Sequence, residues 1–270
     1  GSTQGFQLHP DCGMGQAARR VQNAYKITGE YGLLIQYDGL ARGVQAAVSV
    51  QTFVDPEPKG VKGTSYFEVI ASPTLYPTQT IRATVKTYDN VNPNLSFFID
   101  YYDENGHITT IAGKPFTLNK GVNDLVWKVP DTRGHPIYRL GIKLTSDTRV
   151  DGIIALLNLD WRGAPECFAL GKSMDLSPWL TPWTTSTPWM TMFVSSAKNL
   201  APDYTTTLSI SHPEKNGVVT IGTRDWRNYE TESRITFSQQ TAAGLVARAR
   251  GHRRYYAAVI TGGNAAILKR

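Results

Sequence analysis

The sequence contains few residues that could form a covalent or metal-bound framework. It has 2 cysteines, Cys12 and Cys167, in 270 residues, too few for a disulfide framework or for a zinc site on their own. Two interpretations stay open: one disulfide that brackets a first domain, or two buried free thiols. A disulfide closing so long a loop would stabilise the fold by about 5 kcal/mol in the chain-entropy model.

Long apolar runs and sustained helical periodicity are also missing. No run of about eighteen apolar residues occurs, so no transmembrane helix is predicted. Residues 15–24 fit a short helix or a strand equally well. No signal peptide is visible, and the opening Gly1-Ser2 resembles an expression remnant that could replace a leader. The compartment stays open, with a secreted or cell-surface location slightly favoured.

Motifs of known enzyme classes are absent. The 5 histidines have no metal-ligand spacing, and no nucleophile elbow, P-loop or dinucleotide fingerprint occurs. Carboxylates gather in turns, where solvation explains most of them, although a glycosidase pair needs only spatial proximity. We therefore expect a chain without catalytic residues. Asp151 and Asp160 are candidate ligands for a structural calcium ion, which loop carboxylates hold in many β-sandwiches.

Turn-forming and aromatic residues are plentiful, with 24 Gly, 15 Pro, 13 Tyr, 9 Phe and 6 Trp. Short apolar-alternating segments lie between turn signals, which predicts an all-β fold of two β-sandwich (jelly-roll) domains in tandem. Strands are predicted in the first part at residues 31–37, 44–53, 66–71, 80–88, 95–102, 108–111, 122–129, 137–144 and 153–161, and in the second at residues 205–211, 218–221, 229–237, 244–250, 255–260 and 265–268.

Residues 166–189 form a predicted connector in which Trp179, Trp183 and Trp189 each follow a proline. Proline fixes the backbone and tryptophan offers a large flat face. The rings would either pack the two domains together, which we favour, or stack on a sugar.

The positive charge is concentrated near the C-terminus. Residues 1–223 hold 19 basic and 19 acidic residues, whereas residues 224–270 hold 9 and 3. Arg248 and Arg250 alternate with apolar residues on the predicted strand 244–250. Arginines on a sheet face can bind a carboxylate, a phosphate or sugar hydroxyls. The predicted ligand site is Arg248, Arg250, Arg224, Trp226 and Tyr256; the alternative is a solvated hairpin, and a nucleic-acid surface is disfavoured because it would spread over a whole face.

Residues 29–35 read Gly-Glu-Tyr-Gly-Leu-Leu-Ile and, with residues 98–103, 127–131 and 157–161, resemble strands of galactose-binding-like jelly rolls. This resemblance covers residues 1–165 and implies the fold of many carbohydrate-binding modules. Residues 222–230, 243–248 and 254–256 resemble laminin-G-like or concanavalin-like sandwiches, placed at 190–270. Such a domain usually has further strands, so we expect an incomplete second sandwich, completed by more chain or by a second polypeptide.

The tandem order is similar to the C-terminal accessory region of bacterial ADP-ribosylglycohydrolase-like proteins, whose helical, magnesium-binding catalytic domain has no counterpart in this sequence. The resemblances imply a non-catalytic carbohydrate-binding accessory region of a larger carbohydrate-active protein. The expected partners are a glycan or polysaccharide and a catalytic domain, without a membrane. The alternatives are a glycoside hydrolase with its site at the domain junction, and a purely architectural docking module.

Overall fold

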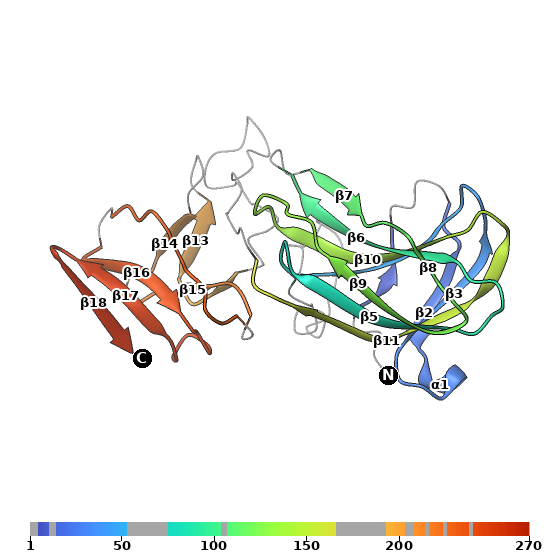
Figure 1. The fold of residues 1–270 in the computed structure, drawn as a ribbon. Coiled ribbons are helices and arrows are strands. Elements are labelled where there is room, and N and C mark those ends of the chain that lie inside the picture. Colours follow the sequence, from blue (N-terminus) through green and yellow to red (C-terminus); the bar gives the residue numbers. More distant parts are fainter. Residues whose placement is uncertain are drawn as a thin grey trace. The chain divides into compact units, whose positions relative to one another are not determined.

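A computed structural model describes residues 5–10, 15–52, 75–103, 107–165, 193–202, 208–213, 216–223, 226–237 and 240–269. The chain forms two compact units, Gly1–Met174 and Asp175–Arg270. Strands dominate both (Figure 1), which confirms the all-β prediction. The predicted connector 166–189, with its three tryptophans, and both cysteines lie outside the described residues. The domain boundaries and the disulfide therefore stay predictions.

The first unit is a β-sandwich of two antiparallel sheets (Figure 1). The first sheet has the order β1 (Gln7–Leu8), β4 (Ala46–Gln51), β10 (Ile137–Thr145), β6 (Asn94–Tyr102), β7 (Ile108–Ala112), and β8 (Phe116–Thr117) also pairs with β6. The second sheet has the order β2 (Ala18–Asn23), β3 (Leu33–Leu40), β11 (Val150–Arg162), β5 (Thr80–Thr87), β9 (Gly121–Lys128). Sequence neighbours β3 and β4 lie in different sheets, as do β10 and β11, which is the jelly-roll arrangement predicted.

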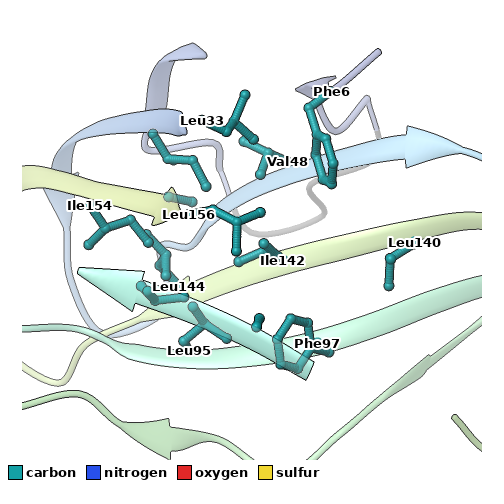
Figure 2. Close-up of a cluster of buried hydrophobic side chains, with 14 of the residues drawn as sticks. Phe6, Leu33, Val48, Leu95, Phe97, Leu140, Ile142, Leu144, Ile154 and Leu156 are labelled. Atoms are coloured by element: carbon teal, nitrogen blue, oxygen red, sulfur yellow. The ribbon is translucent and has the colours of Figure 1, made fainter. Parts of the chain in front are cut away.

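Alternation along each strand builds the core between the sheets. In β5, Ile81, Ala83 and Val85 are buried, whereas the side chains between them point outward. The first sheet contributes Phe97 and Leu140 from the facing side, as Figure 2 shows. Each such side chain stabilises the fold by about 1.5–3 kcal/mol relative to an exposed position. The opposite faces carry polar residues and a smaller apolar cluster of Ala24, Leu34 and Ala155.

A short helix, α1 (Tyr25–Thr28), follows β2 and ends at Gly29, whose φ of 75° is in the left-handed region. The strand alternative for residues 15–24 is the one observed, because residues 18–23 pair with β3. The next residue, Glu30, fixes the loop to β5: Lys86 Nζ donates to it at 2.6 Å and Tyr88 Oη at 2.8 Å. These hydrogen bonds lower the pKa of Glu30 and, from Glu30, raise the pKa of Lys86.

The described residues of the second unit form three small sheets and a small core of Val218, Tyr255 and Ala257. The strands are β12 (Val194–Ser195) with β15 (Val219–Thr220), β13 (Asn199–Pro202) with β14 (Leu208–Ser211), and β16 (Ala242–Ala247), β17 (Tyr256–Thr261) and β18 (Asn264–Lys269) in that order. All six residues of β18 are exposed. The laminin-G-like likeness and the incompleteness of this sandwich stay predictions.

Two predicted strands of this unit are wrong in the described residues. Residues 229–237 form no strand. The strand predicted at 244–250 ends at Ala247, because Arg248 takes a φ of 52°, which an extended strand cannot contain. The N–H of Arg248 donates to Tyr229 Oη at 2.7 Å instead of to a neighbouring strand. The predicted strand 66–71 of the first unit lies outside the described residues.

Gly141 should be intolerant of a side chain. In β10 its missing Cβ makes room for the ring of Phe98, which would collide with any larger residue. We expect Gly141→Ala to cost about 1–3 kcal/mol, as overpacking does. Urea unfolding monitored by tryptophan fluorescence measures this, with Gly262→Ala as the control because nothing lies within 4 Å of a Cβ there. Equal stability of the two variants would contradict the packing described.

The Glu30 anchor predicts a pH-dependent stability. A carboxyl group with a lowered folded pKa stabilises the fold above its unfolded value of 4.5, and this contribution disappears as pH falls through the folded pKa. Glu30→Gln should therefore be less stable than the parent at neutral pH, with the difference vanishing well below pH 4.5. Urea unfolding at both pH values tests this. Asp147→Asn serves as the control because its carboxylate has no partner in the described part of the chain.

Candidate functional site

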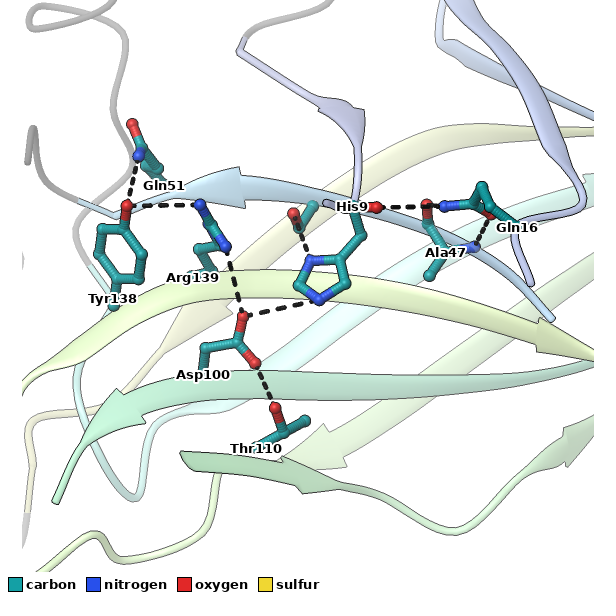
Figure 3. Close-up of polar contacts among 9 residues, drawn as sticks. His9, Gln16, Ala47, Gln51, Asp100, Thr110, Tyr138 and Arg139 are labelled. Carbon is teal, nitrogen blue, oxygen red and sulfur yellow. Dashed lines mark hydrogen bonds and ion pairs between the residues drawn. The ribbon is translucent and has the colours of Figure 1, made fainter. Parts of the chain in front are cut away.

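A row of polar side chains crosses the face of the first sheet that points away from the core. Strand register aligns Gln51 of β4, Arg139 of β10, Asp100 of β6 and Thr110 of β7. Because these residues are direct neighbours on four adjacent strands, their side chains share one face. Figure 3 shows them with Tyr138, His9 and Gln16. We name His9, Ser49, Gln51, Asp100, Thr110, Tyr138 and Arg139 the Asp100 cluster.

An irregularity in β10 brings two adjacent side chains together in this cluster. The register with β6 shifts between Ile137 and Arg139, leaving Tyr138 as an extra residue. On a regular strand Tyr138 and Arg139 would point to opposite faces. Here the guanidinium carbon of Arg139 lies 4.5 Å from the centroid of the Tyr138 ring. Tyr138 Oη accepts hydrogen bonds from Gln51 Nε2 at 2.8 Å and from Arg139 Nη2 at 3.3 Å. The bulge thus places the Tyr138 side chain where it contacts the guanidinium and fixes its orientation.

Asp100 is a buried carboxylate, only 2% exposed. Thr110 Oγ1 donates to its Oδ1 at 2.7 Å, whereas His9 Nε2 and Arg139 Nη1 each lie 3.9 Å from its Oδ2. A direct charged hydrogen bond is about 2.7–2.9 Å long, so both 3.9 Å contacts are ion pairs without a direct hydrogen bond.

His9 is held in place from both sides. Its Nδ1 lies 3.0 Å from Ser49 Oγ, and its ring meets Phe98 edge to face at 5.0 Å between centroids. Its backbone N–H donates to the Ala47 carbonyl at 3.0 Å. Gln16 Nε2 donates to the carbonyls of His9 at 3.3 Å and Ala47 at 2.8 Å. The segment before β2 is therefore fixed to β4, and the imidazole has little freedom to move.

Exposure across the cluster is uneven. His9, Ser49 and Tyr138 are buried with Asp100, whereas Thr110 on β7 is exposed. The Arg139 side chain is 13% exposed, and Gln51 is half-buried. The most exposed side chain of the cluster is therefore at its β7 edge.

The cluster contains the residue types of a serine hydrolase but not its geometry. Ser49, the would-be nucleophile, is 2% exposed, and His9 lies 3.9 Å from Asp100 rather than within hydrogen-bond distance. A glycosidase needs a second carboxylate near the first. The side chains that contact Asp100 in the described part of the chain are Thr110, His9 and Arg139, none of which is a carboxylate.

The site predicted in the second unit is only partly assembled. Arg248 and Arg250 are exposed on the turn after β16 rather than on a sheet face. Trp226 packs over Gly222 and meets Tyr229 at 6.2 Å between ring centroids, so Tyr229 links Trp226 to the Arg248 backbone. Tyr256 lies in β17, with its ring 6.0 Å from Lys269 Nζ. Arg224 lies outside the described residues. The ligand role of these residues stays a prediction.

Asp151 and Asp160 both lie on β11 but have separate partners. Asp151 Oδ1 accepts the N–H of Gly39 at 2.5 Å, which lowers the pKa of this carboxyl. Asp160 Oδ2 accepts from Arg162 Nε at 3.0 Å. Among the described residues, no group of three or more His, Cys, Asp or Glu side chains is placed to hold a metal ion. Calcium at these two residues stays a prediction. The helix in the same residues is too short to cross a membrane.

Sequence reasoning missed the Asp100 cluster, although a signal was present. Residues 95–102 and 137–144 are mostly apolar strands. The first contains one charged residue, Asp100, and the second contains two, Arg139 and Lys143. An acid and a base in predicted core strands suggest a pairing across the sheet. Their partner His9 precedes the predicted strands, so the sequence pattern gave no reason to place it there.

The chain matches no protein-family model and no curated protein. It is similar to a structure from a study of the promiscuous specificity of carbohydrate-binding modules of the β-sandwich superfamily. The identity is 14% and the TM-score 0.39, and the match covers 60% of this chain and 59% of that one. A family 11 carbohydrate-binding module from Clostridium thermocellum, in complex with a mixed-linked tetrasaccharide, gives 13%, 0.35, and coverage of 60% and 91%. The enzymatically active domain of bacteriophage CBA120 tailspike protein 4 gives 13%, 0.33, and coverage of 59% and 19%. Similarities of this size do not extend to function.

Removing the charge of Asp100 should destabilise the first unit. Asp100→Asn leaves Arg139 and His9 facing a neutral amide, and losing a buried charged partner costs about 1–3 kcal/mol. Asp124→Asn is a matched control, because Asp124 accepts from Thr84 at the same 2.7 Å but lies on an exposed surface. Urea unfolding of both variants decides the point. An equal loss of unfolding free energy in both variants would mean that burial does not increase the contribution of Asp100 to stability.

Proposed function

We propose that this chain is a non-catalytic glycan-binding protein and that the Asp100 cluster is its primary site. The main support for this proposal is the buried Asp100 carboxylate, which has two basic side chains, His9 and Arg139, at 3.9 Å. A sugar hydroxyl both donates and accepts a hydrogen bond, so it satisfies an acid and a base together. Neighbouring hydroxyls on one sugar ring could engage Asp100 and Arg139 at once.

Charge balance in the cluster supports a neutral polyhydroxyl ligand. Asp100 and Arg139 carry opposite charges, so a further charged group would meet one repelling partner. Hydroxyls can use both groups without a net charge. Rigidity supports the same function, because Tyr138 contacts the guanidinium and is itself bound by Gln51, while Ser49 holds His9 before any ligand arrives. Groups that are already ordered lose less conformational entropy on binding.

The protein context belongs to the same proposal. We propose that the chain acts as an accessory region of a larger carbohydrate-active protein, of the kind that its resemblance to ADP-ribosylglycohydrolase-like proteins implies, and that another domain supplies any catalysis. The 2% exposure of Ser49 supports this, because a nucleophile must reach its substrate. Hydrolysis at the domain junction and a purely architectural role are the alternatives. The first requires turnover of a glycan, and the second requires that no glycan binds.

Arg139 should be decisive for glycan retention. We expect Arg139→Lys to weaken binding by roughly tenfold, because lysine keeps the charge but loses the planar fork that lies on Tyr138. The measurement is affinity electrophoresis of the whole chain against a panel of neutral polysaccharides, with circular dichroism to verify folding.

Arg82→Lys is the control for this experiment, because Arg82 is exposed on the outer face of the second sheet. Unchanged retention of the Arg139→Lys protein on every glycan that the parent binds would remove the Asp100 cluster as the site. Release of reducing sugar by the parent would favour the hydrolase alternative.

A further inference from the structure

The turn between β16 and β17 carries the densest charge in the chain. Residues 248–254 contain Arg248, Arg250, Arg253 and Arg254, together with His252. We name these residues the arginine turn. All four arginines are exposed, and none of them forms an ion pair within the residues that the structure describes. Four guanidiniums so close together repel one another, and no acidic side chain in the described residues neutralises them.

Backbone hydrogen bonds give the arginine turn a defined shape. The N–H of Arg250 donates to the Arg254 carbonyl at 2.8 Å, and the N–H of Arg254 donates to the Gly251 carbonyl at 3.2 Å. His252 Nε2 lies 3.2 Å from the carbonyl of Val194, which ties the tip to β12. The four guanidiniums therefore extend from a fixed backbone rather than from a loose loop.

The base of the arginine turn is held in an unfavourable conformation. Arg248 has a φ of 52°, a region that few residues other than glycine adopt. The hydrogen bond from its N–H to Tyr229 Oη at 2.7 Å holds it there, and Tyr229 in turn packs against Trp226. Strained residues that the surrounding structure holds in place are concentrated at binding and catalytic sites. Like-charge repulsion and backbone strain thus occur at the same place.

We infer that the arginine turn binds the anionic groups, carboxylate or sulfate, of an acidic polysaccharide. This inference rests on the proposed glycan-binding function and adds a second site to it. All four cations of the turn are arginine rather than lysine, and the planar guanidinium fork matches a carboxylate or sulfate with two parallel hydrogen bonds. One or two charged sugars are enough to engage a single turn.

A nucleic acid fits this surface less well. Proteins that depend on phosphate contacts typically neutralise about 6–10 phosphates along an extended path. The arginine turn spans one connection between two strands, and residues 1–223 have balanced charges. A compact group of cations can bind one or two charged sugars of a polysaccharide without contacting the rest of the polymer.

The test compares three whole-chain proteins by affinity electrophoresis: the parent, the triple variant Arg250→Ala/Arg253→Ala/Arg254→Ala, and the charge-matched control Arg20→Ala/Arg42→Ala/Arg82→Ala. Arg248 is left unchanged because its backbone conformation is part of the fold. The three control arginines are exposed in the first unit. The probes are polygalacturonate, a sulfated galactan, a neutral galactan and single-stranded DNA, at low and at physiological salt. Circular dichroism verifies folding of each protein.

We expect the triple variant to lose retention on polygalacturonate or the sulfated galactan by roughly tenfold at physiological salt, while the control matches the parent. Equal losses in variant and control would reduce the effect to net charge and overturn the inference. The inference would also be overturned if the parent protein bound neither acidic polymer, or if it bound DNA more strongly than either of them. Binding of the neutral probes reports on the proposed function separately, because it depends on Arg139 and not on the arginine turn.

Discussion

The burial of every second side chain between two antiparallel sheets is the constraint on which the first unit depends. Ile81, Val85, Phe97 and Leu140 supply this packing, and the same alternation forces the intervening residues onto the outer faces. The position of Asp100 is therefore set by its neighbours: with Ile99 in the core, Asp100 must face outward. A polar site on the outer face is a geometric consequence of a well-packed interior.

Two kinds of polar surface result, one in each unit. The Asp100 cluster is buried, braced and balanced in charge, so it favours uncharged hydroxyl groups. The arginine turn is exposed, of one sign and held by backbone hydrogen bonds, so it favours anions. The difference follows from desolvation, because an unpaired charge is tolerated in contact with water but not in an interior. The two units thus differ in both the burial and the charge of their polar surfaces.

Period-two patterns allowed the sequence to predict most of the strands of the first unit, including the positions of β5 and β10 in the chain. They failed where the backbone leaves the regular geometry. Nothing in an apolar-polar alternation indicates that Arg248 takes a positive φ. The strand therefore ends at Ala247, three residues before its predicted end at Arg250. The Asp100 cluster was missed for a related reason, because His9, Asp100 and Arg139 come from three distant segments whose pairing depends on sheet order. Sheet order is a property of the whole fold and leaves no local trace.

The extra residue at Tyr138 gives the site a dependence on residue count as well as residue type. Up to Ile137 the pairing of β10 with β6 follows one register, and from Arg139 onward it follows another. Deleting the extra residue would join the two registers into one ladder, with Ile137 opposite Tyr101 and Arg139 still opposite Asp100. The guanidinium would then lose the adjacent Tyr138 ring, which now lies 4.5 Å from it. A chain that kept Asp100 and Arg139 but lacked the extra residue would therefore keep the charge pair and lose the support of its arginine.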